Sequence, residues 1–306
     1  LSLCKLKLKD LKNGFELYEN RWKKNQPIKM KFQHIKYPNS LNEITKKKII
    51  IWDEQGLGDT LQFSRFVIDL LKFTDQITFV VNAKLSQILS SLNKNVLVTS
   101  YENLVSENFD YQLPLCSLPK YLNIDSTDKI NFFTLNKKNK YENNIFLDDK
   151  KFNIGVAWSG NKEYFLDTYR SIPFRYFENI LKLKNINFFK LSKDVRDEDK
   201  SKYTSYPNLI DLGNRSLLEV SEYIKNLDLV ISSDTSIIHL AGILNKKSIL
   251  LLNYNSDWRW FDSINNNVWY PSVQIIKQSK FDSWEEVFMK LEKKLKNLNL
   301  DKKKPE

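Results

Sequence analysis

Short apolar runs alternate with helix-like segments twice along this 306-residue chain, and this alternation constrains the fold more than any other feature. The apolar runs have the length of buried strands, and apolar residues at helical spacing follow most of them. Strands that alternate with helices predict parallel sheets covered by helices. Two such blocks in series predict an α/β protein with two Rossmann-like domains, residues 47–150 and 151–306.

The expected elements follow from periodicity and from the residues that bound each run. We predict strands over residues 48–53, 77–81, 96–100, 109–113, 153–158, 187–191, 229–232, 248–252 and 273–277. We predict helices over residues 60–73, 84–92, 174–183, 217–226, 236–244 and 284–298. The polar stretch 124–150 has no clear periodicity, so we expect the domain boundary near Lys151.

The first 46 residues read differently from the rest of the chain. Apolar residues at near-helical spacing predict one amphipathic helix over residues 1–25. A polar, proline-containing stretch over residues 27–48 resembles a linker. The chain begins with Leu1 rather than Met, so we expect it to be part of a longer protein.

The net charge of +11 suggests a nucleic-acid partner, but its composition argues against one. The chain has 41 Lys and only 7 Arg, and Arg is the residue that reads bases and grips phosphates with two parallel bonds. The excess lies at the ends, with +9 over residues 1–48 and +4 over residues 290–306, whereas the body between them carries −2. We therefore expect no nucleic-acid partner.

Composition also bears on the compartment. No stretch approaches the ~20 apolar residues of a membrane-spanning helix, so we expect no transmembrane segment. Cys4 and Cys116 are too few for a disulfide scaffold, which favours a reducing cytoplasm. The basic ends leave a peripheral position at the inner membrane surface open as an alternative.

The first segment with chemical potential is the turn Asp53–Thr60, after the first predicted strand. In parallel sheets ligands sit beyond the carboxyl ends of strands. Gly56 and Gly58 allow close backbone approach, so we predict them as donor-binding. Asp59 has two interpretations: it caps the next helix, or it faces a cleft as a general base. From the residues alone, capping is favoured.

The second segment, residues 232–242, also follows an apolar strand and opens a helix. Asp234, Thr235 and Ser236 crowd the predicted cap, where hydroxyls and backbone N–H groups can hold a diphosphate. His239 lies one turn further on the same helix face. A lone His is usually structural, but this position favours a functional role.

Two further segments follow strands. Trp158–Asn161 lies shortly before Arg170, whose guanidinium could neutralise a phosphate or be a surface loop charge. Residues 254–261 contain Asp257, Trp258, Arg259 and Trp260, and their rings either stack on a base or sugar or pack in a core. The predicted donor-binding residues in these segments are Trp158, Asn161, Arg170, Asp257, Trp258 and Arg259.

Six stretches in one order carry a family resemblance: EQGLGDTLQF (54–63), FDYQLPLCSL (109–118), GVAWSGN (155–161), RSIP (170–173), LDLVISSDTSIIHLAG (227–242) and DWRW with WYP (257–260, 269–271). Together they resemble the glycosyltransferase domain that follows tetratricopeptide repeats in bacterial proteins. That domain is related to glycosyltransferase family 9, which includes the ADP-heptose lipopolysaccharide heptosyltransferases. Residues 10–22 resemble the end of a last repeat, so upstream repeats would offer surfaces to protein partners.

The resemblance implies a GT-B fold, in which two Rossmann-like domains face each other and the second holds the donor. It implies a metal-independent, inverting transfer from a nucleotide sugar to a glycan or protein hydroxyl, with no cofactor. Asp59 corresponds to the family's proposed catalytic base. Asp234, Thr235, Ser236 and His239 correspond to the segment at the donor diphosphate, with Ser236 in place of the usual Gly, and His239 is a second catalytic candidate. Arg170 stands near a phosphate-binding Lys of the heptosyltransferases.

The alternative function is a catalytically inactive sugar- or nucleotide-binding module of a repeat-containing interaction scaffold. Both alternatives share the fold and differ in what Asp59 does.

Overall fold

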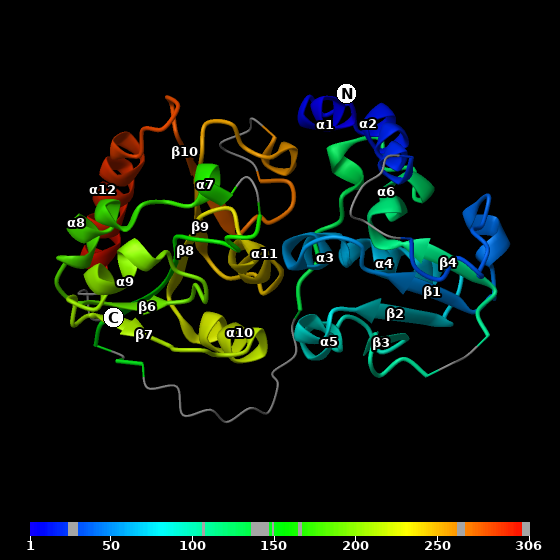
Figure 1. Cartoon of the computed structure of the whole chain (residues 1–306), viewed down its shortest axis with the longest axis horizontal. Helices are drawn as coiled ribbons and strands as arrows, with labels where there is room; N and C mark the ends of the chain where they lie inside the picture. Colours follow the sequence, from blue (N-terminus) through cyan, green and yellow to red (C-terminus); the bar gives the residue numbers. More distant parts are fainter. Residues whose placement is uncertain are drawn as a thin grey trace. The chain divides into compact units, whose positions relative to one another are not determined.

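The computed structural model describes residues 1–23, 30–105, 108–135, 147–148, 150–164, 167–261 and 267–301. The chain forms two compact units. The first unit comprises Leu1–Lys138 together with Asp257–Asp262, and the second comprises Asn139–Ser256 with Ser263–Glu306. Figure 1 follows both along the sequence by colour. The boundary expected near Lys151 stays a prediction.

The first unit is built on a four-stranded sheet in the order β3-β2-β1-β4. Its strands are β1 (Ile49–Trp52), β2 (Ile77–Val81), β3 (Val96–Ser100) and β4 (Tyr111–Pro114), and every recorded pair is parallel. All four residues of the central strand β1 are fully buried. A continuous apolar strand is what helices on both faces of a parallel sheet require.

Helices and short 3-10 turns (η) connect these strands. They are α3 (Leu57–Phe63), α4 (Arg65–Asp69), η3 (Leu70–Lys72), α5 (Ala83–Leu89), η4 (Leu115–Ser117), α6 (Leu118–Tyr121) and η5 (Thr127–Lys129). The helix predicted over 60–73 begins three residues earlier and divides at Ser64.

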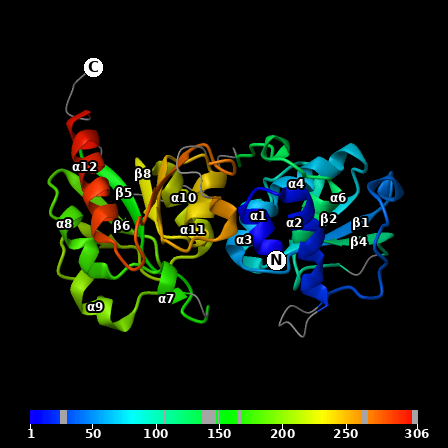
Figure 2. The same cartoon turned by 90° about the horizontal axis from the view of Figure 1, so that it is seen from above.

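The amino-terminal residues do not form the single helix predicted over 1–25. They form α1 (Ser2–Lys7), α2 (Leu11–Tyr18) and η1 (Glu19–Trp22), and residues 24–29 lie outside the described part. The break comes at Lys9, whose φ of 64° is left-handed and cannot continue a right-handed helix. Figure 2 shows α1 and α2 packed side by side within the first unit. Their relation to a helical repeat stays a prediction.

The stretch expected to be a linker packs against the sheet in its described residues. Phe32 and Ile35 cover Trp52, and η2 (Leu41–Ile44) follows. The buried Gln112 amide donates to the carbonyls of Phe32 and Ile35, at 2.5 and 2.8 Å, and accepts from the Trp52 indole at 2.8 Å. A buried amide that satisfies two backbone carbonyls fixes this stretch to the sheet.

A buried ion pair ties the amino-terminal segment to the turn after β1. Arg21 donates to both carboxylate oxygens of Glu54, at 2.8 and 2.9 Å, and to Ser117 Oγ at 2.7 Å. Burial raises the pKa of Glu54, and the Arg21 guanidinium and the Cys116 N–H oppose that rise. The two-pronged geometry makes Arg21 the fixed partner of this turn.

The second unit is built on a six-stranded parallel sheet in the order β10-β9-β8-β5-β6-β7. Its strands are β5 (Phe152–Ala157), β6 (Ile186–Lys190), β7 (Leu209–Asp211), β8 (Leu229–Ser232), β9 (Ser248–Leu252) and β10 (Val273–Lys277). The sequence did not predict β7, because two of its three residues are exposed and it lacks an apolar run.

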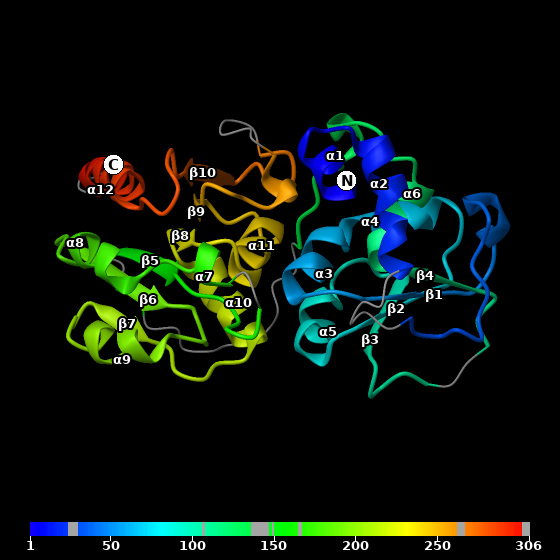
Figure 3. The same cartoon turned by 45° about the horizontal axis from the view of Figure 1, so that its top comes forward.

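The helices of this unit are α7 (Asp167–Arg170), α8 (Glu178–Leu181), α9 (Asp197–Tyr203), α10 (Leu217–Asn226), α11 (Ser236–Ile243) and α12 (Glu285–Asp301), with the turn η6 (Phe174–Tyr176). The turn η7 (Trp258–Trp260), between β9 and β10 in the chain, belongs to the first unit. Helix α12 packs Val287, Leu291 and Leu295 into the core of this sheet, and Figure 3 shows it beside β10. The α/β class with parallel sheets is therefore confirmed.

We predict that Arg21→Met strongly destabilises the first unit. The substitution leaves Glu54 buried without its cation, which costs about 3–5 kcal/mol. Urea unfolding should show the loss, and Arg21→Met with Glu54→Leu should recover part of it because the buried charge is then gone. Arg175→Met, at an exposed site, is the control and should stay within about 0.5 kcal/mol of wild type. An equal loss in the single and double variants would contradict the pairing.

Candidate functional site

Asp59 lies at the start of α3, which Gly56 caps. It is the third helical residue, not the cap itself, and its Oδ2 accepts the Gly56 N–H at 3.0 Å. Asp59 therefore helps to cap α3, because its side chain accepts a backbone N–H of the same turn. Neither Gly56 nor Gly58 has a positive φ, so the turn does not use glycine's left-handed conformation.

A segment from much later in the chain completes the surroundings of Asp59. Residues Asp257–Asp262 belong to the first unit, although the sequence analysis placed them in the carboxyl-terminal domain. Arg259 Nη2 donates to Asp59 Oδ1, and Nη1 donates to Asp257 Oδ1 at 2.8 Å. Burial disfavours the Arg259 charge, but the Asp257 and Asp59 carboxylates outweigh it and raise the pKa of Arg259.

Trp258 anchors this segment by packing. Its ring is 3% exposed and makes edge contacts with Phe15 of α2, at 6.0 Å between centroids, and with Phe63 of α3, at 6.4 Å. Figure 3 shows the orange turn η7 next to the blue helix α1. Both Trp258 and Trp260 are buried, which favours the interpretation that their rings pack in a core over the interpretation that they stack on a ligand.

Two further groups of the first unit interact with Asp59 electrostatically. Burial and the Asp59 carboxylate raise the pKa of Tyr18, whose hydroxyl accepts from Gln55 Nε2 at 2.7 Å. Burial also raises the pKa of the Cys116 thiol, with Glu54 and Asp59 adding to the effect. Tyr18 lies at the end of α2, far from Asp59 in the sequence, and no sequence motif links the two.

The second unit gathers its predicted residues at the carboxyl ends of β5 and β8. Thr235 is the cap of α11, and its Oγ1 accepts the Ile237 N–H at 3.4 Å and lies 3.2 Å from Ser232 Oγ. Ser236 is the first residue of the helix. The predicted start of this helix is thus confirmed, and its first backbone N–H groups lie where an anion can be bound.

Arg170 joins the segment after β5 to the segment after β8. Its Nη1 donates to the Asp234 carbonyl at 3.0 Å, and its Nε donates to Asp167 Oδ1 at 3.0 Å. A Cβ on Gly160 would lie 2.5 Å from Arg170 Nη2, so only glycine lets the guanidinium pack at this point. The side chain remains 23% exposed, which leaves part of the guanidinium accessible.

His239 is 5% exposed and has a hydrogen-bond partner at Nδ1. Nδ1 lies 3.0 Å from the Tyr270 hydroxyl, and Nε2 lies 3.8 Å from Asp234 Oδ1. The Tyr270 ring packs over Gly242, where a Cβ would lie 2.4 Å from the ring. These contacts agree with a structural His, held beside the cap of α11. Tyr270 belongs to the WYP stretch of the family resemblance, but the sequence does not predict its contact with His239.

Two other predicted donor-binding residues, Trp158 and Asn161, have contacts of their own in the second unit. Trp158 is fully buried and packs against Phe174 and Phe177, which gives it a core role. Asn161 is exposed, and its Oδ1 accepts the Glu163 N–H at 3.0 Å. Donor contact by either residue stays a prediction.

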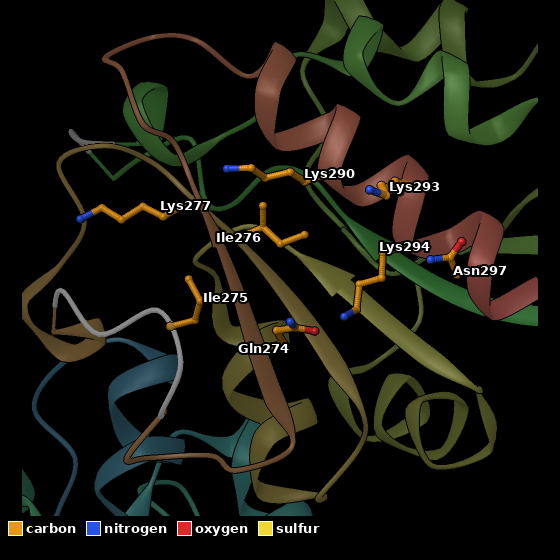
Figure 4. A pocket seen from close by; sticks show the side chains of 8 residues that line it. All are labelled: Gln274, Ile275, Ile276, Lys277, Lys290, Lys293, Lys294 and Asn297. Carbon is orange, nitrogen blue, oxygen red and sulfur yellow. The ribbon is translucent and has the colours of Figure 1, made fainter.

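A separate groove lies between the edge strand β10 and α12 (Figure 4). Its lining includes Lys277 of the strand and Lys290, Lys293 and Lys294 of the helix, part of the basic carboxyl-terminal region. Lysine along an edge strand discourages pairing with other chains. The groove contains none of the predicted donor residues.

Within the described ranges, no group of three or more His, Cys, Asp or Glu side chains is arranged to hold a metal ion. In the same part of the chain, no helix is both long and apolar enough to cross a bilayer.

No protein-family model matches the chain, and no curated protein matches its sequence. Solved structures do match. E. coli ADP-heptose lipopolysaccharide heptosyltransferase II has a TM-score of 0.61 and 12% identity, over 84% of this chain and 100% of that chain. A family 9 glycosyltransferase from Veillonella parvula has a TM-score of 0.58 and 13% identity, over 85% and 99%. E. coli heptosyltransferase WaaC with ADP has a TM-score of 0.54 and 12% identity, over 83% and 99%. At 12–13% identity, these TM-scores show a shared fold alone.

We predict that Gly242→Ala destabilises the second unit, although alanine usually favours a helix. The new Cβ would overlap the Tyr270 ring, and such overpacking costs about 1–3 kcal/mol. The same substitution in a Tyr270→Ala background should cost much less, because the ring is absent. Unfolding free energies of the four proteins give the comparison. Equal costs in both backgrounds would exclude this contact as the cause.

Proposed function

We propose that this protein is a glycosyltransferase that moves a sugar from a nucleotide-sugar donor to a hydroxyl acceptor. The two parallel α/β units and the shared fold with family 9 heptosyltransferases support a nucleotide-sugar enzyme. The proposal includes a GT-B arrangement, inversion at the anomeric carbon and no metal requirement. The proposed acceptor is a glycan or a protein. The reaction would take place in the cytoplasm or at the inner membrane surface.

One observation carries the proposal. Arg170 lies against the Asp234 carbonyl, directly before the amino terminus of α11. A partly exposed guanidinium and the positive dipole end of an eight-residue helix together suit the diphosphate of a nucleotide sugar. Such donors would stabilise the charge that develops as the diphosphate leaves. Thr235 Oγ1 and Ser236 add hydroxyl groups at the same point.

Asp59 is the proposed base. Its carboxylate is 22% exposed and follows the first strand of the first unit, where the acceptor would bind. It would take the acceptor hydroxyl proton as that oxygen attacks the anomeric carbon. With one such carboxylate, a direct displacement that inverts the anomeric centre is expected.

The second candidate function has the same fold but no catalytic activity. Asp59 Oδ1 contacts Arg259 and Oδ2 contacts the Gly56 N–H, and these contacts favour a structural carboxylate in an inactive sugar- or nucleotide-binding module. Upstream repeats would then provide the function by binding protein partners. Turnover separates the two candidates.

A donor-hydrolysis screen tests the enzyme proposal. We expect the wild-type protein to hydrolyse at least one nucleotide sugar slowly in the presence of EDTA, and Asp59→Asn to reduce the rate by about 10²-fold or more, since general-base catalysis contributes that much. Asp128→Asn, on the turn η5, is the control. Binding without turnover by wild type would favour the inactive module, and neither binding nor turnover would exclude both.

Arg170→Ala should weaken donor binding. Loss of a charged hydrogen-bond donor to phosphate costs about 1.5–3 kcal/mol, which is about a ten- to hundredfold rise in the donor KM or Kd. Arg175→Ala, five positions away and exposed, should leave donor affinity unchanged. Titration with the nucleoside diphosphate of the active donor measures both. Unchanged affinity in Arg170→Ala would remove Arg170 from the donor site.

A further inference from the structure

The geometry points to Arg259 as a positioning residue for the base Asp59, held in place by its own chain segment, rather than a ligand of the donor. This inference rests on the proposed function, because it assigns a role within the same reaction. It concerns only contacts inside the first unit.

First, packing and capping contacts hold the segment Asp257–Trp260 in place. Trp258 inserts between Phe15 and Phe63, so side chains of α2 and α3 fix the turn η7 from two sides. Asp257 caps that turn, and its Oδ1 accepts the Arg259 backbone N–H at 3.0 Å. The backbone that carries Arg259 is therefore held by contacts other than those of the Arg259 side chain.

The second step is that the guanidinium bridges two carboxylates. Nη1 binds Asp257 and Nη2 binds Asp59, while the plane lies over the Trp258 ring, 4.8 Å from Cζ to the centroid. The side chain is 11% exposed. A guanidinium engaged in this way has little surface left for a donor phosphate, in contrast to Arg170 at 23%.

The third step concerns the carboxylate. Arg259 orients Oδ1 and the Gly56 N–H orients Oδ2, so the plane of the Asp59 carboxylate is fixed. Each oxygen has more than one lone pair, so a proton can still be accepted. A base that is held in the productive orientation gives a faster reaction, because even a small misplacement of a catalytic group lowers the rate.

The proton balance follows from this arrangement. Asp59 takes the proton of the acceptor hydroxyl, the acceptor oxygen forms a bond to the anomeric carbon, and the bond from that carbon to the diphosphate oxygen breaks with its electron pair on the diphosphate. Arg259 stays protonated throughout and keeps its contact with Asp59 Oδ1. The charged or titratable groups that face Asp59 are Arg259, Tyr18 and Cys116, with Asp257 behind the guanidinium.

The test compares kcat at saturating donor and the donor KM in Arg259→Gln and Arg259→Lys. For Arg259→Gln we expect a kcat about ten- to hundredfold lower, because the partner that orients Asp59 Oδ1 is lost. For Arg259→Lys we expect a kcat between those of wild type and Arg259→Gln, since the charge remains and the two-pronged geometry is lost. The donor KM should change little in either variant.

Arg215→Gln is the matched control. Arg215, just before α10, also pairs with a carboxylate, Glu219 of that helix at 3.0 Å, but both side chains are well exposed. Its variant should keep kcat and the donor KM. A rise in donor KM in Arg259→Gln with an unchanged kcat would make Arg259 a donor ligand and overturn the inference. Equal losses of kcat in Arg259→Gln and Arg259→Lys would also overturn it.

A double-mutant cycle separates this inference from the proposed function. The melting temperatures of Asp59→Asn, Arg259→Gln and the double variant report the contact without turnover. Non-additive shifts support the pair. Additive shifts in an active enzyme overturn the inference and leave the function intact. Non-additive shifts in a wild-type protein that turns over no donor overturn both, because Arg259 and Asp59 are then only a structural pair.

Discussion

The parallel pairing of the strands is the constraint on which the rest of this structure depends. Because neighbouring parallel strands end at the same edge, polar residues that follow different strands are brought together there. In the first unit the Asp53 side chain, after β1, accepts the Asn82 N–H after β2 and the Tyr101 hydroxyl after β3. In the second unit the same geometry brings Arg170 to Asp234. Strand pairing thus explains these two groupings, whereas the Asp59–Arg259 contact depends on a segment from outside the first sheet.

Buried charge is the second constraint. Glu54 and Asp59 stand in one turn, and each is matched by an Arg from a distant part of the chain. Arg21 comes from the amino-terminal helices, and Arg259 comes from the segment between β9 and β10. A carboxylate withdrawn from water needs such a partner. Two of the 7 Arg in the chain are thus committed to ion pairs within the first unit.

Much of the fold was predictable from local signals. The strands from β1 to β6 and from β8 to β10 have apolar runs, and the start of α11 has its cap residue Thr235. The elements that were missed lack such signals: β7 is short and exposed, and the break at Lys9 depends on one left-handed residue inside a periodic pattern. The interpretation of 27–48 as a linker failed for its described part because the Gln112 amide, far along the chain, binds its carbonyls.

The sequence by itself determined where the strands end and which polar residues follow them, because periodicity and helix caps are local properties. Only the tertiary structure decided the partners of those residues. Asp59 and Arg259 are 200 positions apart, and His239 and Tyr270 are 31 apart. It also decided that residues 257–261 belong with the first unit. Contacts of this kind leave no local pattern, since they form only when packing brings buried groups close enough to share charge and hydrogen bonds.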